Sequence, residues 1–207
     1  LASSAASDVY KRQQEIFSLD EMIKIWDPAR ISKSPAIFDP LKLRAINAAY
    51  IRALPAEEFR KLADPFIDQA VHVQIDRDLL CANLQPRCEV LEDIPPQLDF
   101  FDAVLPIDAE MYRNKKQKTT PESAKEALSA LLPVLEAQTD WSRDAIFEAC
   151  KQKAEAMEKK NGWLLFPLGI ALSGKARTPG GGTDLACMMG REKTLQRVQE
   201  ALAKLNG

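Results

Sequence analysis

Histidine and paired cysteines are scarce in this sequence. His72 is the one histidine among 207 residues, so no second imidazole exists to complete a His-based zinc site or a symmetric acid–base pair. This absence argues against a His-based metal centre and against catalysis by histidine. The cysteines form no C-x-x-C pair, and no secretory hydrophobic stretch is found before them. We interpret them as small buried hydrophobic residues in a reducing cytoplasm, rather than as metal ligands or redox groups; they are Cys81, Cys88, Cys150 and Cys187.

Long apolar runs and a basic excess are also missing. The longest apolar stretches have about four or five residues, as at 164–168, whereas a membrane-spanning helix needs roughly 20. We therefore expect no membrane partner. The 28 basic and 30 acidic side chains give a net charge of −2, which excludes a general nucleic-acid coat. Residues 1–105 carry 12 basic and 17 acidic side chains, whereas residues 106–207 carry 16 and 13, so a basic face is expected only in the C-terminal half.

Glycine is absent before Gly162, and all eight glycines lie in the last 46 residues. This absence removes the usual hairpin turns and phosphate-binding loops from three quarters of the chain. Alternating strand patterns are missing too, except for a doubtful stretch from Leu164 to Leu172. Helices joined by proline turns remain. We predict an all-α fold with two helical lobes that meet near residue 105.

Several helix boundaries can be predicted from local signals. Ser18 and Glu21 have the spacing of a capping box, so a helix should begin at Leu19. Thr120 is a typical N-cap before Pro121, and apolar residues recur at helical spacing after it. Three more helices are predicted. One begins with Pro55 as its first residue, a second runs from Ser142 to a left-handed stop at Asn161-Gly162, and the last runs from Arg191 to Leu205.

The first thirteen residues have no apolar periodicity and do not lead into the helix at Leu19. The run from Asp8 to Gln13 resembles the translation of a transposon end used in preparing sequencing libraries. We therefore interpret residues 1–13 as a non-native leader and expect that an upstream part of the protein has been cut away. A disordered Ser/Ala tail or an expression scar is the alternative, and both interpretations exclude the segment from the fold.

Two segments have some features of phosphate-binding loops. Gly169 to Lys175 matches the spacing of a phosphate loop, but Ala176 stands where a hydroxyl should hold magnesium, so coincidence is the better account. Arg30 to Ser34 is similar to the KMSKS loop of class I aminoacyl-tRNA synthetases, yet no nucleotide-binding sheet precedes it. We interpret it as a solvated loop between helices.

A basic run precedes the helix at Pro121. It contains Lys115, Lys116 and Lys118 beside Tyr112. Such runs usually form a solvated face, but this one lies in the positively charged half of the chain. Contact with a phosphate backbone is therefore a second interpretation.

Three segments, taken together and in order, resemble the C-terminal part of bacterial-type glutamyl-tRNA synthetases. The resemblance covers residues 14–207, and each segment is weak alone whereas the ordered set is specific. The segments are Phe17 to Pro40 with Asn47 and Tyr50 to Pro55; Tyr112 to Lys118 with Leu131-Leu132 and Trp141; and Pro167 to Lys175 with Thr178 to Gly182 and Gly190 to Leu195.

The resemblance implies an anticodon-recognising region whose ATP- and glutamate-binding catalytic domain lies upstream. Residues 14–105 would form a stem-contact and first anticodon-binding lobe, and residues 106–207 a C-terminal anticodon-binding lobe. The full-length protein would be a glutamate–tRNA ligase, whereas this chain would be inactive alone and would hold no cofactor, ATP and magnesium being bound by the missing domain. The implied partner is tRNA for glutamate, with tRNA for glutamine left open, and the implied protein is a cytoplasmic monomer.

The same resemblance assigns site residues. Arg87 stands in the predicted helix from Leu79 to Val90, where the family reads the third anticodon base, and a guanidinium suits an unstacked base. The turn holding the first base would contain Thr178, Pro179 and Gly181, and Lys151 matches a basic position near the anticodon loop. The alternative for Arg87 is a surface ion pair with Glu89 or Glu92.

Two departures from the family pattern affect these expectations. Gly169 stands where an arginine usually follows Pro-Leu, so one anticodon contact is either missing or supplied elsewhere. Ala45 and Ala49 replace an aromatic and a polar residue in the first lobe. A rival hypothesis, supported by the net negative charge, is a helical protein-interaction module that binds no nucleic acid.

Overall fold

The computed structural model describes residues 16–30 and 38–206 of the chain. Within this part every regular element is a helix, and the one β pairing is an isolated bridge between Asn114 and Thr119. The predicted all-α class is therefore confirmed. The leader and most of the loop from Arg30 to Ser34 lie outside the described residues.

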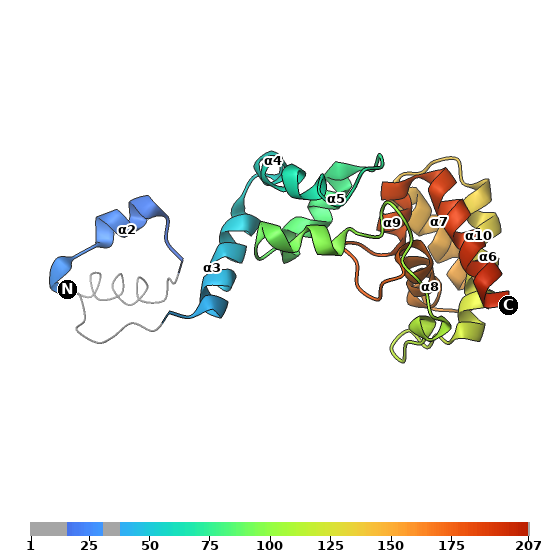
Figure 1. Cartoon of the computed structure of the whole chain (residues 1–207). Coiled ribbons are helices and arrows are strands. Elements are labelled where there is room, and N and C mark those ends of the chain that lie inside the picture. The colour runs from blue at the N-terminus through green and yellow to red at the C-terminus, as the bar shows by residue number, and fades with distance from the viewer. Residues whose placement is uncertain (1–15, 31–37, 207) are drawn as a thin grey trace.

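The helices form two groups that lie side by side, and we call them the N-terminal and C-terminal lobes (Figure 1). The N-terminal lobe contains α2 (Leu19–Ile25), α3 (Pro40–Ala53), α4 (Ala56–Ile67), α5 (Arg77–Leu84) and the short 3-10 turns η1 (Pro28–Arg30), η2 (Gln85–Arg87), η3 (Leu91–Asp93) and η4 (Pro95–Gln97). The C-terminal lobe contains η5 (Ala109–Tyr112), α6 (Pro121–Ala137), α7 (Arg143–Ala156), α8 (Asn161–Ser173), α9 (Gly182–Met189) and α10 (Arg191–Asn206).

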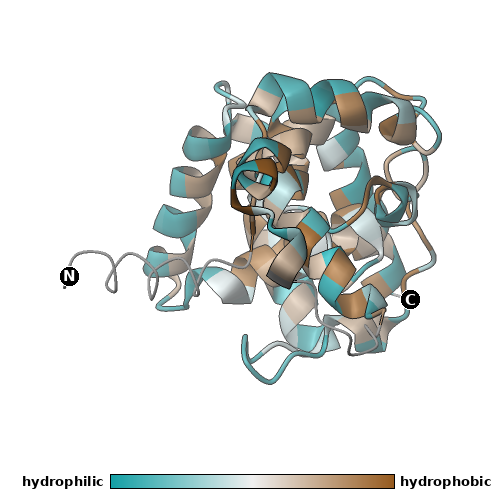
Figure 2. Cartoon of the chain, turned by 90° about the vertical axis from the view of Figure 1, so that its left-hand side faces the viewer, coloured by the Kyte–Doolittle hydropathy of each residue, from teal (hydrophilic) through white to brown (hydrophobic). Residues whose placement is uncertain are grey.

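Helix α8 is the centre of the C-terminal lobe, because it packs against α6, α7, α9 and α10. Most helices carry hydrophilic and hydrophobic residues on different sides (Figure 2). Helix α8 instead has apolar residues all around, as a helix enclosed by others requires. The doubtful strand at Leu164 to Leu172 is therefore wrong. A helix with apolar residues all around has no polar face from which a helical period could be recognised.

The local start signals were mostly correct. Ser18 accepts the backbone N–H of Glu21, and the Glu21 carboxylate accepts that of Ser18, which forms the predicted capping box. Thr120 caps α6 with Pro121 in its first turn. Pro55 differs by one residue, since it is the N-cap of α4 and the helix begins at Ala56.

The predicted stop of α7 at Asn161-Gly162 is wrong. The helix ends at Ala156, and Glu158 adopts the left-handed conformation with φ 54°. Asn161 instead begins α8, and Gly162 lies in its first turn. A Cβ at Gly162 would lie 1.8 Å from Oε1 of Gln117, so this glycine permits close packing of the 114–119 turn on α8 rather than ending a helix.

The two lobes share one continuous hydrophobic core. Phe100 and Phe101 are fully buried and stack with ring centroids 4.5 Å apart, and they belong to the same core as the helices of the C-terminal lobe. Buried Arg197 of α10 donates to the carbonyl oxygens of Phe101 and Leu172. The boundary at residue 105 stays a prediction, because the packing passes through it without a break.

Exposed apolar side chains are concentrated at the N-terminal end. Helix α2 buries no residue, and Trp26, Phe38 and Leu41 are 67%, 76% and 78% exposed. Ala45 of α3 is also exposed, and Ala49 is half-buried. None of the described helices combines the length and the apolarity that a membrane crossing requires.

Candidate nucleic-acid interface

A pocket of about 450 Å³ lies where the N-terminal lobe meets the segment joining α8 to α9. We call it the junction pocket. It brings together three of the predicted site residues, Arg87, Thr178 and Gly181, which are far apart in sequence. The residues lining it are Arg87, Leu165, Phe166, Gly169, Ile170, Lys175, Ala176, Arg177, Thr178, Gly180, Gly181 and Gly182.

The charged side chains that line the junction pocket are all positive. Its lining includes three cationic side chains and no carboxylate, together with an apolar floor of leucine, phenylalanine and isoleucine from α8. Cations and aromatic or aliphatic surface are the groups on which unstacked bases and their phosphates bind. The pocket can therefore accept a planar, negatively charged ligand.

The wall of the pocket begins with a tight turn at the end of α8. Gly174 ends the helix in the left-handed conformation with φ 70°, and a Cβ there would lie 2.7 Å from the carbonyl oxygen of Leu105. The Ser173 hydroxyl donates to the carbonyl of Gly169 at 2.7 Å and accepts the backbone N–H of Lys175 at 3.0 Å. The first glycine of the phosphate-loop pattern is thus inside a helix, and the segment has a different structure from a phosphate loop.

The glycine turn before α9 is held by a second network. The Thr178 hydroxyl donates to the carbonyl of Gly180, and the backbone N–H of Gly181 donates to Oδ2 of Asp184 at 2.7 Å. Asp184 Oδ1 accepts from Nε of Arg143 at 2.6 Å, which raises the pKa of that arginine. Pro179 is buried within the turn. Its role is therefore to hold the turn rather than to expose a surface.

Arg87 occupies a different element from the one predicted. Helix α5 ends at Leu84, and Arg87 lies in the following 3-10 turn η2, because Pro86 has no N–H to continue the α-helix. The side chain is exposed and forms no hydrogen bond or ion pair with any described residue. The alternative ion pair with Glu89 is not formed, since that carboxylate accepts from Nε of Arg44 at 3.0 Å.

The remaining predicted cations lie outside the pocket lining. Lys151 on α7 pairs with Glu148 at 3.2 Å and is 40% exposed. Lys115, Lys116 and Lys118 are exposed on the turn closed by the Asn114–Thr119 bridge, and Lys118 has φ 57°. Tyr112 differs from these exposed lysines, because the residue is only 1% exposed.

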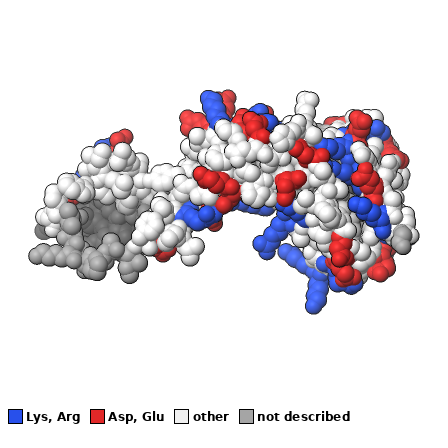
Figure 3. Space-filling view, in the orientation of Figure 1, with Lys and Arg blue, Asp and Glu red and all other residues white. Residues whose placement is uncertain are grey.

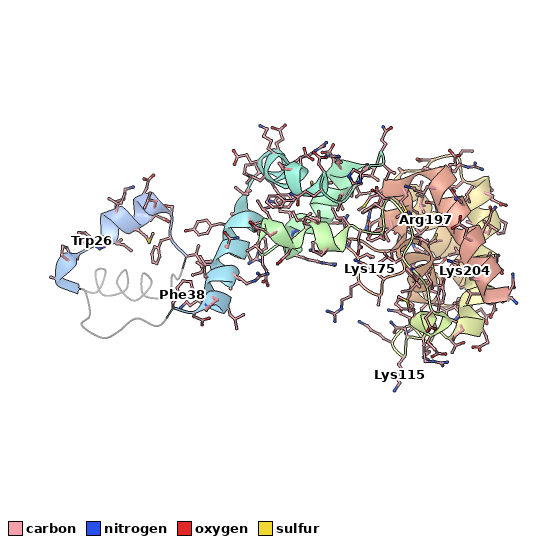
Figure 4. All side chains as sticks on the ribbon, in the orientation of Figure 1. Trp26, Phe38, Lys115, Lys175, Arg197 and Lys204 are labelled. Carbon is pink, nitrogen blue, oxygen red and sulfur yellow. The ribbon has the colours of Figure 1, made fainter. Side chains whose placement is uncertain are left out.

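Basic side chains project from the lower edge of the molecule (Figure 3). Lys115 reaches outward on this edge, whereas Lys175 lies where the two lobes meet (Figure 4). The ammonium of Lys175 is 2.5 Å from Oδ1 of Asp99 and donates to the carbonyl of Pro96 at 2.7 Å. This lysine therefore ties the pocket wall to the N-terminal lobe.

Sequence reasoning did not single out Arg177, Arg143 or Asp184. Arg177 lines the pocket beside the predicted turn, and no local pattern marks it. Asp184 had a usable signal, because an acidic residue three positions after Gly181 has capping-box spacing. Arg143 could be found only from the folded structure, where it reaches Asp184 across 41 residues of sequence.

The cysteines occupy the packing positions predicted for them. Cys81, Cys88 and Cys150 are buried and Cys187 is half-buried, and all four are free thiols. Burial raises the pKa of Cys81 and Cys88 to about 11 and that of Cys150 to about 12. Thiols with such pKa values stay protonated and unreactive near neutral pH.

Comparison with known proteins relates most of the chain to one family. The family model described as an anticodon binding domain matches residues 47–202. A glutamate–tRNA ligase of Clostridium botulinum is 40% identical over 193 residues, which are 93% of this chain and 40% of that protein. A glutamate–tRNA ligase of Clostridium acetobutylicum is also 40% identical, over 192 residues.

A solved structure agrees with these relatives. The crystal structure of a glutamate tRNA ligase from Elizabethkingia meningosepticum in complex with its amino acid superposes with a TM-score of 0.80 at 26% identity. The match covers 94% of this chain and 38% of that one. The chain thus spans about two fifths of the length of the relatives that it matches.

Proposed function

This chain belongs to the anticodon-binding domain family, and from that premise we propose that it is the C-terminal, tRNA-recognising part of a glutamate–tRNA ligase. The observation that carries the proposal is the junction pocket, which combines three cations, no carboxylate and an apolar floor. The relatives that match 92–93% of the chain are named glutamate–tRNA ligases, which supports the choice of amino acid.

We assign the third anticodon base to Arg87 and the first to the turn of Thr178, Pro179 and Gly181. The unpaired guanidinium of Arg87 can donate two parallel hydrogen bonds to a base edge and can stack on its face. The turn can present backbone groups and the Thr178 side chain to a second base, because Asp184 and Pro179 fix its shape. Lys151 remains a weaker candidate, since its ammonium is already paired with Glu148.

The turn between Asn114 and Thr119 would contact the phosphate backbone. Lys115, Lys116 and Lys118 are exposed and have no carboxylate partner among the described residues. Phosphate contacts of this kind position the RNA and supply affinity without reading sequence.

The rest of the ligase would carry the chemistry. We propose that ATP, magnesium and glutamate bind in the part of the longer protein that this chain does not span, so the chain alone should not aminoacylate. Its partner would be tRNA for glutamate, with tRNA for glutamine as a second candidate. We place the protein in the cytoplasm as a monomer, where it would serve protein synthesis.

Binding measurements test this function against the rival protein-interaction module. Anisotropy titrations with tRNA for glutamate should give micromolar or weaker binding that falls steeply with salt, because phosphate counterions are released. Absence of binding even at low ionic strength would refute tRNA recognition and favour the rival.

The variant Arg87→Gln makes the test specific. It should cost about 1–3 kcal/mol of discrimination at the third anticodon base, as expected for loss of a bidentate contact. Arg52→Gln is the matched control, because Arg52 is also exposed but lies on α3 outside the pocket. Identical base preferences for the two variants would show that Arg87 is only a surface residue.

A further inference from the structure

The junction pocket contains a second guanidinium that no family position accounts for. Arg177 is exposed, lines the pocket, and forms no hydrogen bond or ion pair with any described residue. Lys175, two residues before it, differs because its ammonium is occupied by Asp99 and Pro96. Of the three cations in the pocket lining, the two arginines therefore remain available to a ligand.

The two arginines come from different lobes. Arg87 belongs to η2 of the N-terminal lobe, and Arg177 belongs to the segment after α8 in the C-terminal lobe. The bond from Lys175 to the N-terminal lobe fixes the start of the segment that carries Arg177. The partly exposed Phe166 side chain contributes a flat apolar surface to the same lining. A base held here would meet guanidinium donors from both lobes.

Gly169 contributes no side chain to the pocket lining, although the family resemblance places an arginine at this position. A Cβ at Gly169 would meet only the backbone N and Cα of Gly182, at 3.8 and 3.9 Å, which are ordinary contacts. A Cβ at this position would therefore cause no clash. Arg177 reaches the same pocket from a neighbouring segment and can supply the missing guanidinium.

We propose that Arg177 is a specificity-determining residue that reads the middle base of the anticodon. This inference rests on the proposed function. Arg87 is assigned to the third base, and the turn beginning at Thr178 is assigned to the first. Arg177 lines the same pocket as Arg87 and directly precedes Thr178 in the chain, so it lies between the two assigned positions. Glutamate codons have adenine in the middle, so the anticodon has uracil there. Uracil presents carbonyl acceptors to a guanidinium, which is a donor only.

The experiment measures binding of the full chain to anticodon stem-loops that differ at one base. Wild type, Arg177→Ala, Arg177→Lys and the control Arg52→Ala are compared on stem-loops with uracil or cytosine in the middle position. Arg177→Ala should reduce the preference for uracil about tenfold or more. Arg177→Lys should keep the salt dependence but lose the preference, because a lysine retains the charge without the planar fork.

A complementing variant separates this role from a structural one. Gly169→Arg combined with Arg177→Ala should restore part of the middle-base preference, since both positions line the same pocket. An unchanged preference in both Arg177 variants, while Arg87→Gln still alters the third position, would overturn the role of Arg177 and leave the proposed function intact. A wild-type chain with no base preference at any position would overturn the proposed function as well.

Discussion

Replacing Asp184 should uncouple the glycine turn from the C-terminal lobe. This carboxylate has a side chain only 12% exposed and accepts both the Gly181 N–H and the Arg143 guanidinium. Asp184→Ala removes both bonds, whereas Arg143→Ala removes only the second of them, together with the exposed ion pair between Arg143 and Asp144. The two variants therefore measure different parts of the same network.

The magnitudes follow from exposure. A hydrogen bond to a charged partner is worth about 1.5–3 kcal/mol, whereas an exposed ion pair contributes about 0.2–1 kcal/mol. The Arg143 side chain is 50% exposed, so it can hydrate once its partner is lost. We expect Asp184→Ala to lower the free energy of unfolding by about 2–3 kcal/mol and Arg143→Ala by less than about 1 kcal/mol. Asp184→Asn should lie between them, because its amide oxygen can still accept the Gly181 N–H.

Urea denaturation followed by circular dichroism measures these differences, with binding of tRNA at the first anticodon position measured in parallel. Asp184→Ala should weaken discrimination at that position, and Asp184→Asn should largely preserve it. Equal losses of stability from Asp184→Ala and Arg143→Ala would show that the ion pair, rather than the bond to Gly181, fixes the turn. That result would refute the reasoning.

Three further outcomes are expected. Calorimetry with magnesium–ATP should show no binding that depends on Lys175, whose ammonium is occupied by Asp99; tight binding abolished by Lys175→Ala would restore the phosphate-loop interpretation. Deleting residues 1–37 should leave the midpoint of thermal unfolding unchanged, since α2 buries no residue, and a clear decrease would contradict this. The hydrogen bond with His72 lowers the pKa of Asp102, so Asp102 should stabilise the fold above the ordinary carboxylate pKa of about 4 and lose that effect as pH falls through its lower folded value. Asp102→Asn should flatten this acid limb in urea titrations across pH, and an unchanged limb would count against it.

Structural features that depend on three or four consecutive residues were predictable from the sequence. Ser18 and Thr120 cap their helices as expected, because a side-chain oxygen and the N–H groups it satisfies lie within one turn of the chain. The helix α8 was not recognised, since periodicity reveals a helix only when one face meets water. The left-handed conformation of Glu158 was not predicted either, because asparagine and glycine favour that conformation and Asn161-Gly162 follow shortly after it in the sequence.

The site was predictable only in part for the same reason. The glycine turn is local, and the residues from Thr178 to Gly181 do form a hydrogen-bonded turn, whereas their contact with a base stays a prediction. The convergence of Arg87 with Thr178 depends on how two lobes pack, which no short pattern encodes. Arg177 carries no motif at all. Its proposed role in binding rests on the pocket that it shares with Arg87 and on the absence of a carboxylate partner for it among the described residues.

The buried Arg197 explains how a pocket between two lobes can keep its shape. Its side chain donates to the carbonyl of Leu172, one of the last residues of α8, and to that of Phe101, a buried residue of the N-terminal lobe. Carbonyls at a helix C-terminus lack partners within the helix and attract positive charge. Burial lowers the pKa of Arg197, yet an arginine remains protonated at neutral pH. One cation therefore satisfies carbonyl groups of both lobes just before the chain turns at Gly174 into the pocket wall, and it helps to fix the spacing between Arg87 and the turn from Thr178 to Gly181, to which we assign the third and first anticodon bases.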